Sequence, residues 1–152
     1  TVHARTKVEG YEPPAHWIWV RKIAEAVTIP VTANGDVFTL EDYLGIKQES
    51  GCDSIMIGRG AVIRPDLARQ IKQYEQEGYA EAMPFNEIFE WIRLFYDLCL
   101  RKEGQKKYPA ARLKQWLGMM KKAYPQAETL FACVRPIKDT HDIRAALHAF
   151  KA

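Results

Sequence analysis

The chain has 152 residues, of which 47% are hydrophobic, and a net charge of +3. This is enough apolar material for a buried core, and it excludes an intrinsically disordered protein. The longest apolar runs are far shorter than a bilayer span, so we expect a cytoplasmic protein with no membrane partner. Cys52, Cys99 and Cys133 form no CxxC pair. We therefore predict no disulfide framework and no metal site, and we expect three small buried side chains.

Charge divides the chain into an acidic and a basic part. Residues 1–100 contain 10 Lys and Arg against 15 Asp and Glu, whereas residues 101–152 contain 12 against 4. A one-signed excess of this size indicates that the basic part contacts a polyanion.

The first eighty residues alternate between apolar strands and helical segments. Residues 1–5 are typical of the end of a buried strand, and residues 15–27 carry an apolar face of helical period. No methionine or helix precedes this strand, so we expect a fragment of a longer protein. The apolar face consists of Val20, Ile23, Ala24 and Val27.

Two further strands follow, each ending in a polar step that contains glycine. The first ends at Asn34-Gly35-Asp36, and Thr39 with Asp42 then resembles a capping box for a helix that Gly51 ends. The second ends at Gly58-Arg59-Gly60, and Pro65 is typical of the first turn of the next helix.

Three such βα units indicate an α/β fold with parallel strands, which we interpret as the C-terminal part of a TIM (β/α)8 barrel over residues 1–80. Three units cannot close an eight-stranded barrel. Either the missing strands lie in a preceding part of a full-length protein, which is then expected to be a monomer, or the chain pairs its open edges with another copy.

Residues 81–152 show no further β pattern. Pro84, Pro109, Pro125 and Pro136 separate four amphipathic stretches, which predicts an all-α helical bundle as a second domain.

The two strand-end motifs predict an anion site. Glycine lets backbone N–H groups approach a ligand, and the arginine between two glycines supplies a positive fork. In (β/α)8 enzymes the loops after strands seven and eight commonly bind phosphate. Two alternatives stay open: Asn34-Gly35-Asp36 as a simple tight turn, and Arg59 in a structural salt bridge.

His3 and Arg5 are two residues apart in the first strand, so we expect their side chains to point to the same face and into the same cleft as Arg59. A hydrogen-bonded structural role for His3 is the alternative.

The basic helical region predicts contact with nucleic-acid phosphates, because few acidic residues offset it. A solvated charged helix face is the alternative interpretation. The expected contact residues are Lys106, Lys107, Arg112, Lys114, Gln115, Trp116, Lys121 and Lys122.

Taken together, these motifs resemble the C-terminal half of the tRNA-dihydrouridine synthases. The resemblance covers essentially the whole chain, and the helical part is most similar to the bacterial C subgroup of that family. It is carried by His3-Ala4-Arg5-Thr6, Gly10-Tyr11, Ala33-Asn34-Gly35-Asp36, Gly51 to Ala61, Ala111 to Leu117, Glu128 to Phe131 and Val134-Arg135.

The resemblance implies a flavoenzyme in which FMN takes hydride from NADPH and reduces a uridine of tRNA, with a cysteine protonating the base. It implies that His3 contacts the flavin, that Asn34, Gly35 and Asp36 contact its ribityl-phosphate region, and that Gly58 and Arg59 contact its phosphate. We expect Arg5 to join the basic helical residues in contacting tRNA. The C subgroup implies uridine 16 of the D-loop.

Two departures from the family pattern affect this expectation. Ala4 stands where the family usually has glycine, and none of the three cysteines lies in the catalytic motif, which belongs to the preceding half of the family's barrel. We therefore expect no turnover and weak or no FMN affinity from this chain alone. The rival interpretations are an FMN-dependent barrel oxidoreductase acting on a small metabolite and a non-catalytic RNA-binding module.

Overall fold

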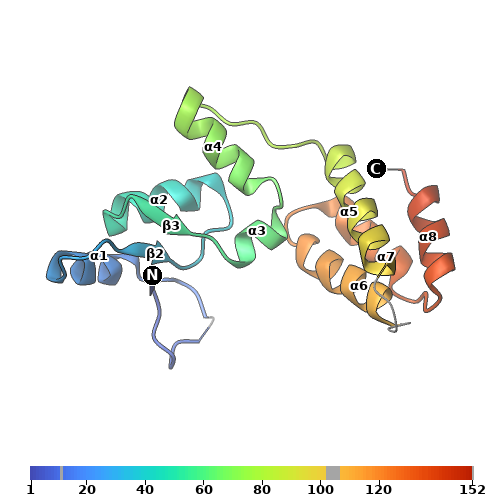
Figure 1. The fold of residues 1–152 in the computed structure, drawn as a ribbon, viewed down its shortest axis with the longest axis horizontal. Helices are drawn as coiled ribbons and strands as arrows, with labels where there is room; N and C mark the ends of the chain where they lie inside the picture. Colours follow the sequence, from blue (N-terminus) through green and yellow to red (C-terminus); the bar gives the residue numbers. More distant parts are fainter. Residues whose placement is uncertain (11, 102–106, 152) are drawn as a thin grey trace. The chain divides into compact units, whose positions relative to one another are not determined.

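The chain folds into two units, which are Thr1–Glu81 and Ala82–Ala152 (Figure 1). The computed structural model describes residues 1–10, 12–101 and 107–151. In this part the protein is a mixed α/β structure with a small parallel sheet and eight helices.

Unit 1 is built on three short parallel strands in the order β1-β2-β3. In their register His3 pairs with Asn34, and Asn34 pairs with Met56. The strands therefore end level with one another. They are β1 (Val2–His3), β2 (Thr32–Asn34) and β3 (Ser54–Met56), and the helices of this unit are α1 (Trp17–Ala26), α2 (Leu40–Ser50), α3 (Arg59–Ile63) and α4 (Leu67–Glu77).

Local signals fix both ends of α2. The Thr39 side chain accepts from the Asp42 backbone N–H at 3.1 Å, and the Asp42 carboxylate accepts from the Thr39 N–H at 2.9 Å. Gly51 ends the helix in the left-handed conformation with φ 67°, which costs a glycine little. The predicted capping box and helix stop are confirmed.

The predicted apolar face of α1 is only partly buried. Val20 is fully buried, but Ile23 is 43% exposed and Val27 is 40% exposed. The sheet has only three strands, each two or three residues long, so it covers only part of the helix.

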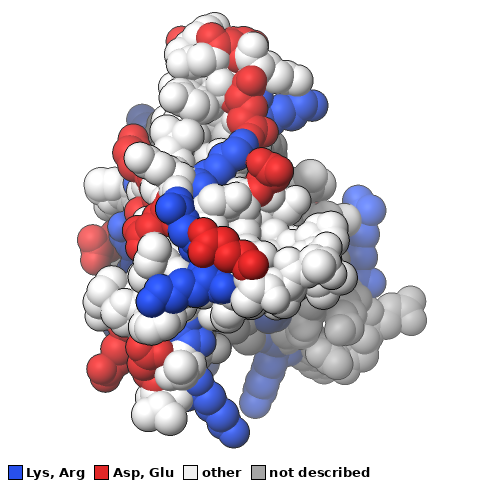
Figure 2. Space-filling model, turned by 90° about the vertical axis from the view of Figure 1, so that its left-hand side faces the viewer, with Lys and Arg blue, Asp and Glu red and all other residues white. Residues whose placement is uncertain are grey.

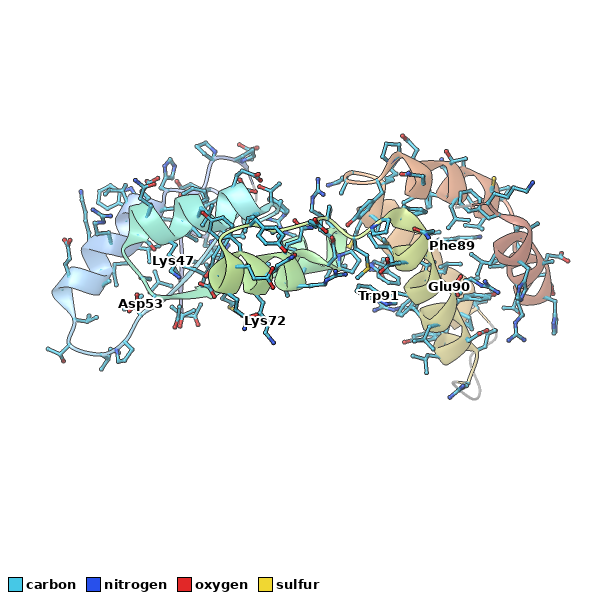
Figure 3. The ribbon with its side chains drawn as sticks, turned by 90° about the horizontal axis from the view of Figure 1, so that it is seen from above. Lys47, Asp53, Lys72, Phe89, Glu90 and Trp91 are labelled. Carbon is cyan, nitrogen blue, oxygen red and sulfur yellow. The ribbon has the colours of Figure 1, made fainter. Side chains whose placement is uncertain are left out.

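In its described residues, unit 2 has four helices around one hydrophobic cluster. Within α5, Phe89 belongs to this cluster and is 5% exposed, whereas Trp91 lies on another side of the helix and is 38% exposed (Figure 3). The four helices are α5 (Phe85–Leu100), α6 (Tyr108–Met120), α7 (Pro125–Val134) and α8 (Thr140–Ala149).

Tyr96 makes the stability of unit 2 sensitive to high pH. Its ring is 1% exposed, and its hydroxyl donates to the Thr140 carbonyl oxygen at 2.9 Å. Burial, with a contribution from the charge of Asp139, raises the pKa of Tyr96 from 10.0 to about 12. In the unfolded chain the Tyr96 hydroxyl ionises with the unshifted pKa of 10.0. The stability that comes from keeping this hydroxyl neutral in the folded protein is therefore fully present below pH 10 and is lost as the pH rises through about 12.

We expect the free energy of unfolding to fall by up to about 2 kcal/mol across this interval. Urea unfolding of the native chain and of the variant Tyr96→Phe at both ends of the interval measures the effect. The variant should show a smaller fall, and an equal fall in both proteins would contradict the assignment.

The cysteines differ in their surroundings. Cys52 and Cys99 are buried as predicted, but Cys133 is exposed. The prediction for Cys133 was wrong because it lies on α7 away from Ala127, Leu130 and Val134, which form that helix's buried side.

Within residues 1–10, 12–101 and 107–151, no helix has the length and apolar character needed to cross a membrane. In the same residues no three His, Cys, Asp or Glu side chains gather as metal ligands.

Candidate anion-binding site

The carboxyl ends of the three strands meet at one edge of the sheet. Parallel strands place their ends together, and the register aligns His3, Asn34 and Met56 in one row. The Asn34 side-chain amide donates to the Met56 carbonyl oxygen at 2.7 Å and so ties β2 to β3 at this edge. Ligands of open α/β sheets bind outside such strand ends.

A cavity of about 240 Å³ lies at this edge. The structure brings together there all six residues that the sequence predicts as cofactor contacts, namely His3, Asn34, Gly35, Asp36, Gly58 and Arg59, and adds Val37, Phe38, Met56 and Gly60.

The turn after β2 is held in place from behind. The Trp17 indole Nε1 donates to the Gly35 carbonyl oxygen at 2.8 Å. A Cβ on Gly35 would lie 3.1 Å from the Cβ of Ala4 and 3.3 Å from that of Ala15, and its φ is +142°. Asp36 follows with φ 52°, a left-handed conformation that aspartate adopts more readily than most residues. Packing and hydrogen bonding thus fix the backbone that lines the cavity.

The two strand-end loops are in direct contact at Gly60. A Cβ on Gly60 would lie 1.8 Å from the Val37 carbonyl oxygen and 3.2 Å from the Phe38 Cα. Glycine is therefore required for the close approach of the loops. At Gly58, by contrast, a Cβ would meet no atom within 4 Å, so the space in front of this residue is open to a ligand.

The charges at the cavity form a chain of two arginines around one carboxylate. Arg5 pairs with Asp36 through both terminal nitrogens, Nη1 lying 3.0 Å from Oδ1 and Nη2 contacting Oδ2. Arg59 also contacts this carboxylate, with Nη2 at 3.4 Å from Asp36 Oδ1 and its guanidinium carbon 5.6 Å from the centre of the Phe38 ring. Its side chain is 43% exposed, so Arg59 combines an ion pair with access to the cavity.

The structure places Arg5 differently from the sequence prediction. Strand β1 ends at His3, so the alternation of side chains does not continue to Arg5. The Arg5 side chain is 1% exposed and is directed to Asp36. This placement disagrees with the expected contact between Arg5 and RNA, because a buried ion-paired guanidinium does not reach a phosphate on the surface.

Several predicted RNA contacts in unit 2 have partners within the chain. Lys114 donates to the Ile137 carbonyl oxygen, Gln115 accepts from Arg112 at 2.6 Å, and Trp116 packs edge-on against Phe95 at 4.8 Å between ring centres.

Four more lysines belong to the predicted RNA-binding set. Lys121 lies 3.9 Å from Glu128 and 5.5 Å from the centre of the Phe131 ring. Lys107 and Lys122 are exposed, whereas Lys106 lies outside the described residues.

Charge is distributed differently on unit 1. Figure 2 shows acidic and basic side chains interspersed over one side of this unit, so this side carries no one-signed patch.

Sequence reasoning missed the roles of Arg5 and Trp17 behind the cavity. A signal for Arg5 was available, because adjacent parallel strands of matching register bring a residue just past β1 close to one just past β2, and these residues carry opposite charges. No sequence signal marked Trp17, whose hydrogen bond to Gly35 depends on the path of the loop before α1.

Comparisons with known proteins match nearly the whole chain. The family model described as "Dihydrouridine synthase (Dus)" matches residues 1–151. A protein of Neisseria meningitidis serogroup A named "tRNA-dihydrouridine(16) synthase" is 66% identical over 151 residues, which cover 99% of this chain and 45% of the relative.

Proteins of the same name are similar in other bacteria. The one from Aquipseudomonas alcaligenes is 48% identical over 93% of this chain and 45% of its own length. The one from Pseudomonas syringae pv. tomato is 44% identical over 96% of this chain and 46% of its own length. The chain thus spans about half the length of the curated relatives that it matches.

Proposed function

Because this chain belongs to the dihydrouridine synthase family, we propose that the protein containing it reduces a uridine of tRNA to 5,6-dihydrouridine. The observation that carries the proposal is the family match over residues 1–151 together with the cavity at the strand ends. The names of the relatives support uridine 16 as the target, and the proposed place in the bacterial C subgroup rests on the sequence resemblance of the helical part. A tRNA substrate also favours a cytoplasmic location.

We further propose that unit 1 is the C-terminal part of a (β/α)8 barrel, and that its cavity takes one end of FMN. The open space at Gly58 and the half-exposed Arg59 guanidinium suit a phosphate group. At about 240 Å³ the cavity is smaller than the 300–1,000 Å³ typical of whole ligand sites. The lining residues therefore fit the phosphate and ribityl end of FMN, and additional lining residues are needed for the remainder of the cofactor.

The six predicted contact residues would then divide between the parts of FMN. Arg59 and the Gly58 backbone would hold the phosphate, the turn from Asn34 to Asp36 would contact the ribityl chain, and His3 would contact the flavin ring. FMN, when bound, supplies hydride received from NADPH to the C5–C6 bond of the uridine. A base must leave its stack to reach a buried flavin, which is the usual way in which enzymes modify bases.

Reduction of tRNA transcribed in vitro tests this function. A full-length synthase that contains this chain is incubated with FMN, NADPH and the transcript, and mass spectrometry of nuclease fragments locates any uridine that has gained two hydrogens. Dihydrouridine at position 16 supports the proposal. Residues 1–152 alone serve as the inactive control, and a full-length enzyme that reduces a free metabolite but no tRNA would favour the small-metabolite oxidoreductase.

We propose that unit 2 is a helical domain that binds tRNA through its exposed cations. Lys107 and Lys122 are exposed, and contact with phosphate releases counterions from the RNA. We expect Lys107→Gln combined with Lys122→Gln to weaken tRNA binding about tenfold and to reduce the log-log salt slope by about 1 for each lysine in contact.

Lys72→Gln is the control for this double variant. Lys72 is an exposed lysine on α4 of unit 1, so its loss should leave the salt slope unchanged. Filter binding at several salt concentrations measures the Kd for tRNA and its log-log salt slope for each variant. A slope that the double variant leaves unaltered would remove the support for this surface and favour a non-RNA role.

A further inference from the structure

The Asp36 carboxylate lies in a cavity proposed to hold a phosphate, so two negative groups would be close together there. A carboxylate close to a phosphate opposes its binding, and Asp36 contacts the same arginine that would receive the phosphate, at 3.4 Å. If Asp36 had no other partner, its single negative charge would cancel that of Arg59.

The second partner of Asp36 is Arg5. This guanidinium engages both carboxylate oxygens and is 1% exposed, whereas Asp36 is 15% exposed and Arg59 is 43% exposed. Paired bonds between an arginine and a carboxylate are the strong geometry for this pair. The contact of Arg59 Nη2 with Asp36 Oδ1 is longer, at 3.4 Å. The carboxylate is therefore satisfied mainly from the buried side.

We propose that Arg5 is a positioning residue that neutralises Asp36, so that Arg59 presents its positive charge to the anionic end of the ligand. This inference rests on the function proposed above and assigns Arg5 a role in the cofactor site instead of the RNA surface. Asp36 in turn orients Arg59 from one side, while its own charge is balanced by Arg5. The three groups together leave one positive charge at the mouth of the cavity.

The test compares FMN with riboflavin, which lacks the phosphate, as ligands of a full-length synthase that contains this chain. Arg5→Met should weaken FMN binding at least about tenfold and lower the ratio of the riboflavin Kd to the FMN Kd by a similar factor. Both effects are expected because Asp36 then pairs with Arg59 alone and offsets its positive charge. Arg5→Met combined with Asp36→Asn removes both charges and should restore the ratio to within about threefold of the native protein.

Arg21→Met is the matched control. Arg21 is another partly buried arginine of unit 1, and its Nη2 donates to the Gln48 carbonyl oxygen at 2.6 Å, away from the cavity lining. For Arg21→Met, the ratio of the riboflavin Kd to the FMN Kd should stay within about twofold of that of the native protein. If Arg5 only stabilised the fold, Arg5→Met would weaken FMN and riboflavin binding equally and leave the ratio of their Kd values unchanged, and this result would overturn the proposal.

The double variant also covers the case in which Arg5→Met does not fold. Removing a buried ion pair as a whole is often tolerated, whereas removing one partner leaves an unpaired charge. A folded double variant that loses the preference for FMN by more than about tenfold would overturn the proposal. Failure of the native protein to bind FMN at all would instead contradict the proposed function on which the inference rests.

Discussion

Replacing Arg59 with alanine in the full-length synthase will weaken FMN binding by about 100-fold and leave riboflavin binding within about threefold. Arg59 lines the cavity with its side chain 43% exposed. Hydrogen bonds between charged groups contribute about 1.5–3 kcal/mol each, and a hundredfold change corresponds to about 2.7 kcal/mol. Titration of each flavin by fluorescence quenching gives both dissociation constants.

Arg69→Ala is the control for this measurement, because Arg69 is an exposed arginine on α4 outside the cavity lining. It should leave both constants unchanged. Equal losses for FMN and riboflavin in Arg59→Ala would indicate general damage to the site, and no loss in either would show that the phosphate lies elsewhere.

Gly60→Ala should lower the free energy of unfolding by about 3 kcal/mol, at the upper end of the usual cost of overpacking. The added Cβ would lie 1.8 Å from the Val37 carbonyl oxygen, a backbone atom that cannot rotate away. The loops that carry Asn34-Gly35-Asp36 and Gly58-Arg59 must then separate, so FMN binding should weaken as well. Urea unfolding followed by tryptophan fluorescence measures the stability of the variant.

Gly118→Ala makes the same substitution where there is room. Gly118 lies inside α6, and a Cβ there would meet the Phe131 ring at 3.8 Å, an ordinary contact. In a helix interior alanine is more favourable than glycine by up to about 1 kcal/mol, so Gly118→Ala should be at least as stable as the native protein. If Gly60→Ala lowered the free energy of unfolding by less than about 1 kcal/mol, the two strand-end loops would be able to separate at little cost, contrary to the prediction.

Signals that are local in the sequence predicted much of the fold. The capping box of Thr39 and Asp42 and the stop at Gly51 depend on residues within one helix, and helices occur at the four amphipathic stretches of the second half. Apolar strands that end in glycine-containing polar steps also predicted which residues gather at one cavity, because parallel strands bring their ends together.

Features that depend on contacts between distant segments were missed. The pairing of Arg5 with Asp36 joins residues 31 positions apart, and the partner of a buried arginine is fixed only when the strands are aligned. The short helix α3 begins at Arg59, and within it Gly60 lies against the Val37 backbone, a contact between segments more than twenty residues apart. Exposure of Ile23 and Cys133 depends on which neighbours cover each helix, and the helical period alone does not contain this information.

A crystal structure of the full-length synthase with FMN bound tests the account most directly. We expect the Arg59 guanidinium to lie within hydrogen-bond distance of the FMN phosphate oxygens, while Arg5 still pairs with Asp36 behind it. A structure in which the phosphate binds elsewhere, with Arg59 contacting only Asp36, would contradict the account.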